Sequence, residues 1–185
     1  TQVNDIVNFP TYTSTDDTTQ IKQQIKEHIK DYGGVYFQFY GGSLTDNECY
    51  NKKTGAIYSD DDTKYNVNHS ALLIGWDDNY SKDNFLKNKR PQNNGAWIVK
   101  NSWGTENRYS LTEMKETIFN QLSDKCIENG WTSASKIPDD VAKKAFEDIG
   151  YTIENDDAVM KVGDNGFMYI SYEDVNVYKY LVGIT

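Results

Sequence analysis

The chain has 185 residues, a formal net charge of −9 at pH 7 and 14% aromatic residues, among them 14 tyrosines and 4 tryptophans. This aromatic content excludes a disordered chain, and the length suffices for one domain with a core, or for one domain with a large insertion. The scattered acidic residues argue against nucleic acid or an anionic membrane as a partner, since both need clustered Lys and Arg, and no apolar run approaches the roughly 20 residues that span a bilayer.

The first regular element predicted by the sequence is a helix. Residues 1–16 show no periodicity and are expected to be an extended lead-in. Residues 16–34 predict a helix that ends at Gly33, because isoleucines recur with a spacing of four on one face: Ile21, Ile25 and Ile29. His28 lies off this stripe and is expected to be a solvated surface histidine.

Several short runs predict strands, because they are rich in β-branched and aromatic residues and are bounded by glycine or polar residues. They are residues 35–40, 55–59, 71–76, 95–103 and 166–174, with 177–184 as a sixth candidate. One helix followed by several strands predicts an α+β domain with an antiparallel sheet or an open barrel.

A stretch with helical periodicity interrupts the strands. Residues 110–130 carry apolar side chains at helical spacing, and residues 137–150 have a proline near their start and end at a glycine, as a second helix would. The stripe of the first helix is Leu111, Met114, Ile118, Leu122 and Cys126. We therefore expect a main domain of residues 1–106 and 163–185, and a mostly helical insertion subdomain of residues 107–162.

Two cysteines are too few for a disulfide framework. Cys49 and Cys126 can form one bridge or remain two thiols, and the sequence leaves both alternatives open. Cys126 lies on the apolar stripe, so we expect it to be packed and inert.

A histidine and an asparagine stand at the ends of two predicted strands. His69 lies at the start of the strand predicted at 71–76, and Asn101 lies toward the end of the strand predicted at 95–103. If the two strands pair antiparallel, the start of one meets the end of the other. The Asn101 carbonyl can then accept from one ring nitrogen and leave the other to take a proton, with Trp103 above the bond. The alternative is a strand-end histidine and a turn asparagine without catalytic roles.

Three ordered motifs resemble the C-terminal half of the papain-like cysteine peptidases. "VNHSALLIGWDDNY" (67–80) resembles the family's catalytic-histidine strand, "NNGAWIVKNSWGT" (93–105) its Asn-Ser-Trp-Gly motif, and "GDNGFMYISYED" (163–174) its Gly-x-x-Gly-aromatic strand. Residues 21–40 are similar to the helix and strand that begin this half. "YNKKTGAIY" and "GWDDNYSKDNF" are similar to the bacterial, clostridial-type branch, which includes many secreted or cell-surface peptidases.

The resemblance implies a fold and a set of roles. The fold is α+β, with an antiparallel open β-barrel-like sheet and one N-terminal helix, the right-hand domain of the family. His69 is implied to be the general base and acid, Asn101 its orienter and Trp103 the shield, with Ser102 supporting the site. The substrate is implied to be a protein or peptide, and no metal or cofactor is expected. The family and the Asn-, Asp-, Lys- and Tyr-rich composition together suggest a bacterial protein that is secreted or at the cell surface.

The nucleophile that the resemblance implies is missing from this sequence. In the family it is a cysteine at the N-terminus of a helix in the left-hand domain, so we expect a Cys-bearing domain or chain as the partner and little activity from this chain alone. Cys49 lies in what looks like a polar loop, where this branch has no nucleophile, and it is an unlikely substitute.

The chain departs from the family at the second motif. The family continues Asn-Ser-Trp-Gly with two residues and then Trp-Gly, whereas here the pattern resumes only at Gly163. The insertion is therefore expected to emerge beside Trp103, on the primed side of the presumed cleft. It can be an exosite, a cap or a docking surface.

Two other functions remain as alternatives. One is a non-catalytic papain-like binding module that uses the helical insertion as an interaction surface. The other is a calcium or carbohydrate site in the acidic loops at 59–64 and 75–83, but neither loop has the spacing of a dedicated calcium loop. In either papain-like case the isolated domain is expected to expose an apolar patch, and so to have a partner or self-associate.

Overall fold

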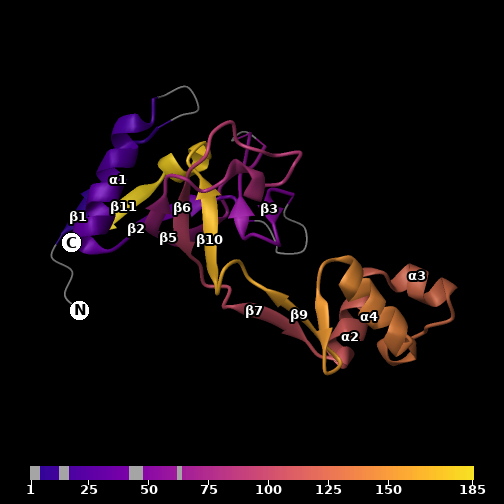
Figure 1. Cartoon of the computed structure of the whole chain (residues 1–185). Helices are drawn as coiled ribbons and strands as arrows, with labels where there is room; N and C mark the ends of the chain where they lie inside the picture. Colours follow the sequence, from indigo (N-terminus) through magenta and orange to yellow (C-terminus); the bar gives the residue numbers. More distant parts are fainter. Residues whose placement is uncertain (1–4, 13–16, 42–47, 62–63) are drawn as a thin grey trace. The chain divides into compact units, whose positions relative to one another are not determined.

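The computed structural model describes residues 5–12, 17–41, 48–61 and 64–185, and its contacts divide the chain into two units (Figure 1). Unit 1 consists of Thr1–Thr105 and Val162–Thr185, and unit 2 of Glu106–Lys161. Each unit has a hydrophobic cluster of its own. In the described part of the chain, no helix has the length and apolar character needed to cross a membrane.

Unit 1 is built on an eight-stranded mixed sheet with the order β1-β11-β2-β5-β6-β10-β4-β3. The strands are β1 (Ile6–Asn8), β2 (Val35–Phe39), β3 (Tyr50–Asn51), β4 (Ala56–Ile57), β5 (His69–Asp77), β6 (Ala96–Lys100), β10 (Phe167–Ser171) and β11 (Leu181–Ile184). Neighbouring strands are antiparallel except β4 and β10, which pair parallel, so the prediction of an antiparallel sheet is wrong for that pair. β4 has two residues, too few for a sequence pattern to show its direction. The sheet is open, with β1 and β3 at its edges, and barrel-like curvature stays a prediction.

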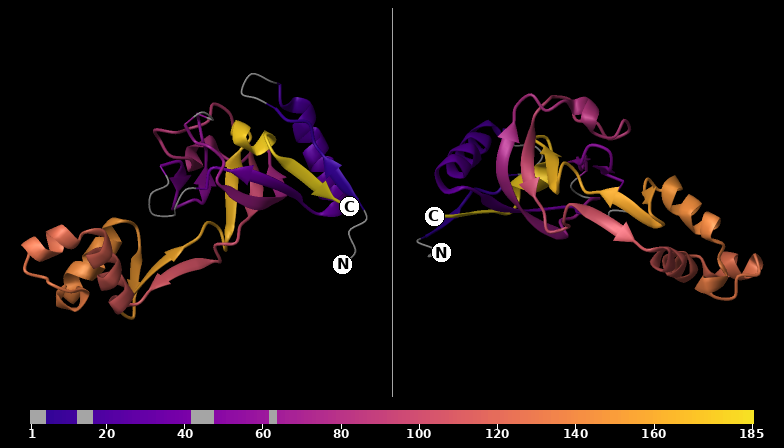
Figure 2. Two further views of the ribbon diagram at one scale, coloured as in Figure 1. Left: turned by 180° about the vertical axis from the view of Figure 1, so that it is seen from behind. Right: turned by 60° about the horizontal axis from the view of Figure 1, so that its bottom comes forward.

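The predicted N-terminal helix is α1 (Thr19–Tyr32), which lies against β2 and β5 (Figure 2). Asp17 starts it by accepting hydrogen bonds from the backbone N–H and the hydroxyl of Thr19. The isoleucine stripe is buried against the sheet, as predicted. The helix ends at Gly33, whose positive φ of 102° suits a residue without a side chain.

The prediction for His28 is wrong, because this side chain is only 6% exposed. The segment that contains β1 lies beside α1 and places the Phe9 ring 5.7 Å from the imidazole, centroid to centroid. Gly183 of β11 leaves the space that the ring occupies, since a Cβ there would lie 2.5 Å from Nε2. The periodicity of the helix does not reveal this second covering segment.

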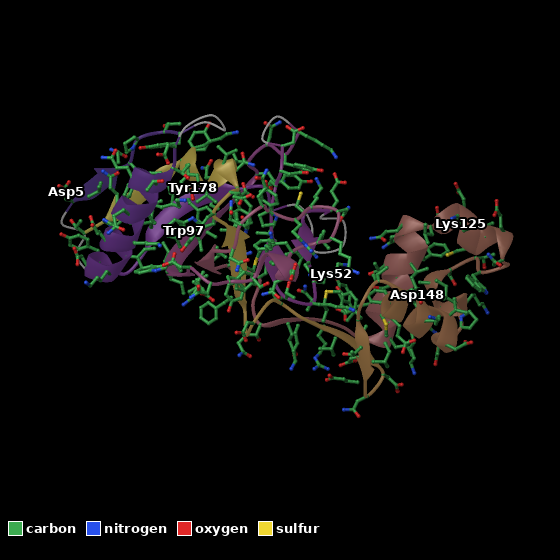
Figure 3. The ribbon with its side chains drawn as sticks, turned by 45° about the horizontal axis from the view of Figure 1, so that its top comes forward. Asp5, Lys52, Trp97, Lys125, Asp148 and Tyr178 are labelled. Atoms are coloured by element: carbon green, nitrogen blue, oxygen red, sulfur yellow. The ribbon has the colours of Figure 1, made fainter. Side chains whose placement is uncertain are left out.

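The C-terminal segment is a short 3₁₀ helix followed by a strand, so the strand predicted at 177–184 is wrong for its first half. The 3₁₀ helix is η3 (Val175–Tyr178). Its Tyr178 hydroxyl accepts from Nε1 of Trp97 at 3.3 Å and donates to the carbonyl of Tyr172 at 2.9 Å (Figure 3). The Tyr178 side chain is buried in the core, and its hydrogen bond to Trp97 joins the segment before β11 to β6 in the middle of the sheet. A further 3₁₀ turn is η1 (Lys82–Asn84).

Unit 2 contains three α-helices, one 3₁₀ helix and a small sheet. Its elements are β7 (Glu106–Tyr109), α2 (Leu111–Gln121), α3 (Ser123–Glu128), η2 (Ala134–Lys136), α4 (Asp139–Asp148), β8 (Thr152–Glu154) and β9 (Asp157–Lys161). The strands form an antiparallel sheet in the order β7-β9-β8. A Ser110–Glu113 capping box begins α2.

The single helix predicted for residues 110–130 is wrong, because Leu122 interrupts it. Its backbone departs from helical values at φ −131° and ψ 37°, and its side chain is 47% exposed rather than in the stripe. Cys126, on α3, is buried in the unit 2 core as expected. The β8–β9 hairpin was not predicted, although Asn155 and Asp156, both with positive φ, form the kind of turn that joins such strands.

Candidate active site

The two strands that carry His69 and lead to Asn101 pair antiparallel, which is the condition that the sequence hypothesis set for a shared site. β5 and β6 are antiparallel neighbours, with Leu72 opposite Lys100. Continuing this register beyond the end of β6 places His69 opposite Trp103. The pairing therefore brings the first residue of β5 to the segment that follows β6, where Asn101 lies.

The imidazole of His69 is held by a single amide oxygen. Nε2 of His69 lies 2.8 Å from Oδ1 of Asn101, and the backbone N–H of Ser102 donates to the same oxygen at 2.7 Å. Because a backbone N–H can only donate, the atom facing both groups must be the amide oxygen, and Nε2 must carry the proton. Nδ1 is then the nitrogen that can accept a proton.

Aromatic rings enclose this hydrogen bond. The Trp103 indole stacks on the His69 ring with centroids 5.1 Å apart and an interplanar angle of 26°, and Phe39 meets the ring edge-on at 5.3 Å. The His69–Asn101 bond is partly buried. Rings on two sides limit the access of water to it, which strengthens the hydrogen bond.

Two further residues position the pair and were not identified from the sequence. Nδ2 of Asn101 donates to the sulfur of Met168 on β10 at 3.1 Å. Gly41 lies against His69, where an added Cβ would be 2.6 Å from the histidine Cβ. The strand predicted at 166–174 contains Met168, but its contact with Asn101 could not be predicted, because that contact depends on the β6–β10 register.

Neither cysteine has the surroundings of a nucleophile. Cys49 lies in the turn before β3, as the predicted loop requires, but it is 1% exposed rather than in polar surroundings, and burial raises the pKa of its thiol to about 11. Cys126 is 2% exposed in the other unit. The two remain thiols and do not form a disulfide. A thiol with a raised pKa is a poor source of thiolate at neutral pH.

Each of the two acidic loops has an aspartate that forms an ion pair with a lysine. Asp60 pairs with Lys89 at 2.5 Å, and Asp78 with Lys26 at 2.5 Å. Within the described ranges, no group of three or more His, Cys, Asp or Glu residues is placed to hold a metal ion. Part of the loop at 59–64 lies outside these ranges, at residues 62–63.

Comparisons with known proteins are consistent with this geometry. A family model described as papain family cysteine protease matches residues 2–121. Two solved structures are similar to the chain. One is the clostridial cysteine protease Cwp84 after propeptide cleavage, with 23% sequence identity and a TM-score of 0.52 over 99% of this chain and 29% of that chain. The other contains the cysteine protease and lectin-like domains of Cwp84, a surface layer associated protein of Clostridium difficile, with 24% sequence identity and a TM-score of 0.50 over 98% of this chain and 25% of that chain. The chain thus spans less than a third of either. No curated protein matches.

Proposed function

Because the chain belongs to the papain family of cysteine proteases, we propose that it is the histidine- and asparagine-bearing half of a thiol peptidase, which hydrolyses peptide bonds with a cysteine from a segment outside these 185 residues. The observation that carries this proposal is the hydrogen bond from His69 Nε2 to Asn101 Oδ1 beneath Trp103. It leaves Nδ1 available as the base.

In the proposed reaction His69 is first the general base and then the general acid. Nδ1 takes the proton of the incoming thiol, and the resulting imidazolium stabilises the thiolate that attacks the peptide carbonyl. The same proton then goes to the leaving amine. Asn101 keeps the ring in one tautomer and orientation throughout. Cys49 and Cys126 do not supply the thiol in this proposal, because both are buried.

A row of side chains on one face of the sheet is the surface that we propose a partner segment covers. Tyr36, Leu72, Lys100 and Phe167 are successive partners across β2, β5, β6 and β10. Leu72 and Phe167 are large apolar residues on this row, and each is 37% exposed. We assign this face to contact with the Cys-bearing segment, because covering it removes apolar surface from water.

Unit 2 is, in this proposal, an insertion subdomain of the peptidase. The backbone N–H of Val162 donates to the carbonyl of Thr105 at 2.9 Å, so the chain leaves and re-enters unit 1 at adjacent points. The exit point is two residues after Trp103. We further propose a secreted or cell-surface location in a bacterium, supported by the description of Cwp84 as surface-layer associated.

Thiol labelling of the protein isolated from its native source tests the proposal. Iodoacetamide at limiting concentration should alkylate one cysteine much faster than the others, and peptide mapping should place it outside this sequence. In a His69→Ala variant expressed in the same source, that fast labelling should fall by at least about tenfold, because the imidazolium no longer favours the thiolate. Asn120→Ala, an exposed change on α2, serves as the control.

Native mass spectrometry of the same sample identifies where the reactive cysteine resides. A reactive cysteine on the same polypeptide or on a co-purifying chain supports the proposal. A homogeneous 21.2 kDa species whose two thiols react slowly would overturn it and leave a non-catalytic binding module.

A further inference from the structure

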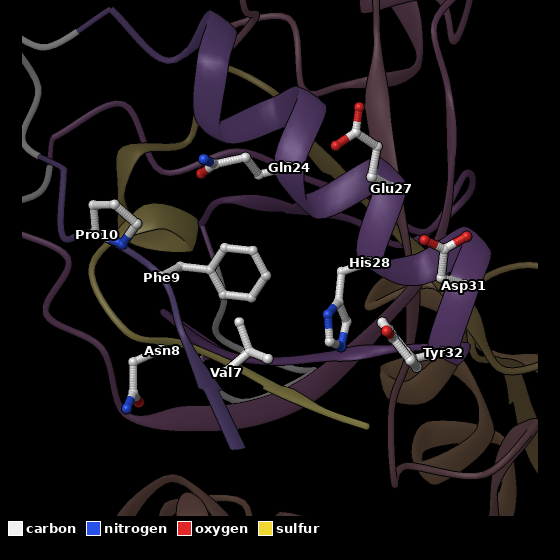
Figure 4. A pocket seen from close by; sticks show the side chains of 9 residues that line it. All are labelled: Val7, Asn8, Phe9, Pro10, Gln24, Glu27, His28, Asp31 and Tyr32. Carbon is white, nitrogen blue, oxygen red and sulfur yellow. The ribbon is translucent and has the colours of Figure 1, made fainter. Parts of the chain in front are cut away.

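A pocket away from the candidate active site lies in unit 1, between α1 and the segment that contains β1. It has a volume of about 380 Å³ and is lined by residues 7–10 and by Gln24, Glu27, His28, Asp31 and Tyr32 of α1 (Figure 4). This volume lies within the usual range for small-molecule sites. The proposed peptidase chemistry uses none of these residues.

The polar side of the pocket is negatively charged. Glu27 and Asp31 are four residues apart on α1 and therefore neighbours on one helix face, where like charges repel. Among the described residues no ion pair joins either carboxylate to a cation, and Glu27 accepts only an amide N–H of Gln23 at 2.9 Å. Both lie in the C-terminal half of the helix, where the helix dipole also favours a positive charge.

The other side of the pocket is aromatic. The ring of Tyr32, whose residue is 58% exposed, lies 4.9 Å from that of His28, centroid to centroid. Figure 4 shows the His28 side chain projecting from α1 between Phe9, Val7 and Tyr32. Aromatic faces beside carboxylates provide an environment that binds organic cations.

His28, which lines the pocket, carries an unsatisfied polar atom. Its Nε2 is buried against Gly183 and has no hydrogen-bond partner among the described residues. A buried polar atom without a partner is rare in folded proteins and calls for an explanation. In the tautomer that carries its proton on Nδ1, Nε2 is an acceptor and calls for a donor.

We propose that this pocket binds a primary ammonium group on a short apolar stem, with the charge near Glu27 and Asp31 and the stem against Phe9 and Tyr32. The two carboxylates and the helix C-terminus favour a cation, and the aromatic walls, His28 among them, favour an alkyl stem. A lysine side chain in a polypeptide and a free alkylamine share this chemistry.

Two-dimensional ¹H–¹⁵N NMR titrations of the full chain distinguish the two sources. The probes are N-acetyl-lysine-N-methylamide, n-pentylamine, and N-acetyl-norleucine-N-methylamide as the uncharged control. We expect saturable shifts of Gln24 to Tyr32 amides with a charged probe, a change in the ¹⁵N resonance of His28 Nε2, and no saturation with norleucine. Tighter binding of the lysine probe than of pentylamine would identify a peptide-borne side chain.

The double variant Glu27→Gln, Asp31→Asn should weaken binding of the charged probe by about tenfold, as expected for the loss of two partly solvated charge interactions. The matched control is Glu116→Gln, Asp124→Asn, which removes two carboxylates of unit 2 that form no ion pair within the described chain. Equal affinities in the two double variants would overturn the proposal. So would equal binding of the charged and uncharged probes, or charged-probe binding without any shift at His28.

Discussion

The sulfur of Met168 accepts a hydrogen bond from Nδ2 of Asn101 at 3.1 Å, while Oδ1 of the same amide faces His69. Met168 is fully buried on β10 and lies opposite Val99 of β6. The orientation of the amide is thus determined from both ends, by the thioether on one side and by the N–H of Ser102 on the other.

Replacing Met168 with leucine tests this arrangement. Met168→Leu keeps the volume but removes the acceptor, so stability should fall by less than about 1.5 kcal/mol. The amide should become less firmly held, and long-range ¹H–¹⁵N spectra of the His69 ring should show a smaller fraction of the Nε2-protonated tautomer. An unchanged tautomer ratio would show that the Ser102 N–H alone fixes the amide.

Replacing Asn101 tests the proposed catalytic role. In the complete peptidase, Asn101→Ala should lower kcat/KM by about 10²–10⁴-fold, because the imidazole loses the partner that sets its tautomer and orientation. Asn120→Ala, on the exposed side of α2, should leave the rate unchanged. Peptidase assays at several pH values check both, and an Asn101→Ala enzyme with normal kcat/KM would contradict the role.

Gly41 is required because the backbone passes directly over His69. In Gly41→Ala the new Cβ would lie 2.6 Å from Cβ and 3.0 Å from Cγ of the histidine, atoms too close to the backbone to swing aside. We expect a loss of about 1–3 kcal/mol in the free energy of unfolding, measured by urea denaturation. Gly75→Ala on β5 is the control, since the nearest neighbour of its added Cβ would be at an ordinary 3.4 Å. Equal losses in the two variants would contradict the steric explanation.

Local patterns predicted the elements that carry the candidate site. The isoleucine stripe of α1 follows from periodicity, and strand composition located β5 and β6. Their antiparallel pairing was a condition of the hypothesis, and in the structure it brings His69 to Asn101. Such patterns are readable because each reflects burial on one face of a regular element.

What the sequence did not predict depends on contacts between distant segments. His28 is buried by a segment some twenty residues earlier in the chain and by a glycine near the C-terminus. Cys49 looks polar from its neighbours but is buried in the core. The parallel pairing of β4 with β10 likewise joins short strands whose own residues carry no signal of direction.

Asp174 gives unit 1 a pH-dependent stability. The residue is fully buried and accepts backbone N–H groups of Ser59 and Asn176, and burial raises its pKa to about 7. Between about pH 4 and pH 7 the unfolded carboxyl is ionised while the folded one retains its proton. The folded state therefore binds more protons, and this group's contribution to stability falls with rising pH by up to about 1.4 kcal/mol per unit.

Asp174→Asn isolates that contribution, because the amide does not titrate. The variant also loses one acceptor for a backbone N–H, which costs about 1–3 kcal/mol. Urea denaturation should show that the free energy of unfolding differs more between the native protein and the variant at pH 4.5 than at pH 7.5. A difference in the free energy of unfolding that grows toward pH 7.5 would contradict this. It would mean that the two N–H donors lower the pKa of Asp174 more than burial raises it, so that the carboxylate is ionised in the folded protein.

Removal of unit 2 tests whether it is an insertion with a core of its own. The carbonyl of Thr105 and the N–H of Val162 are hydrogen-bonded at 2.9 Å, so a two-glycine linker in place of Glu106–Lys161 closes unit 1 with little strain. The core of unit 1 is made by residues outside the deleted segment. The shortened chain should therefore unfold cooperatively and keep the His69 tautomer of the full chain by ¹⁵N NMR. Loss of cooperative unfolding would show that unit 1 depends on unit 2 for its stability and would contradict the insertion subdomain.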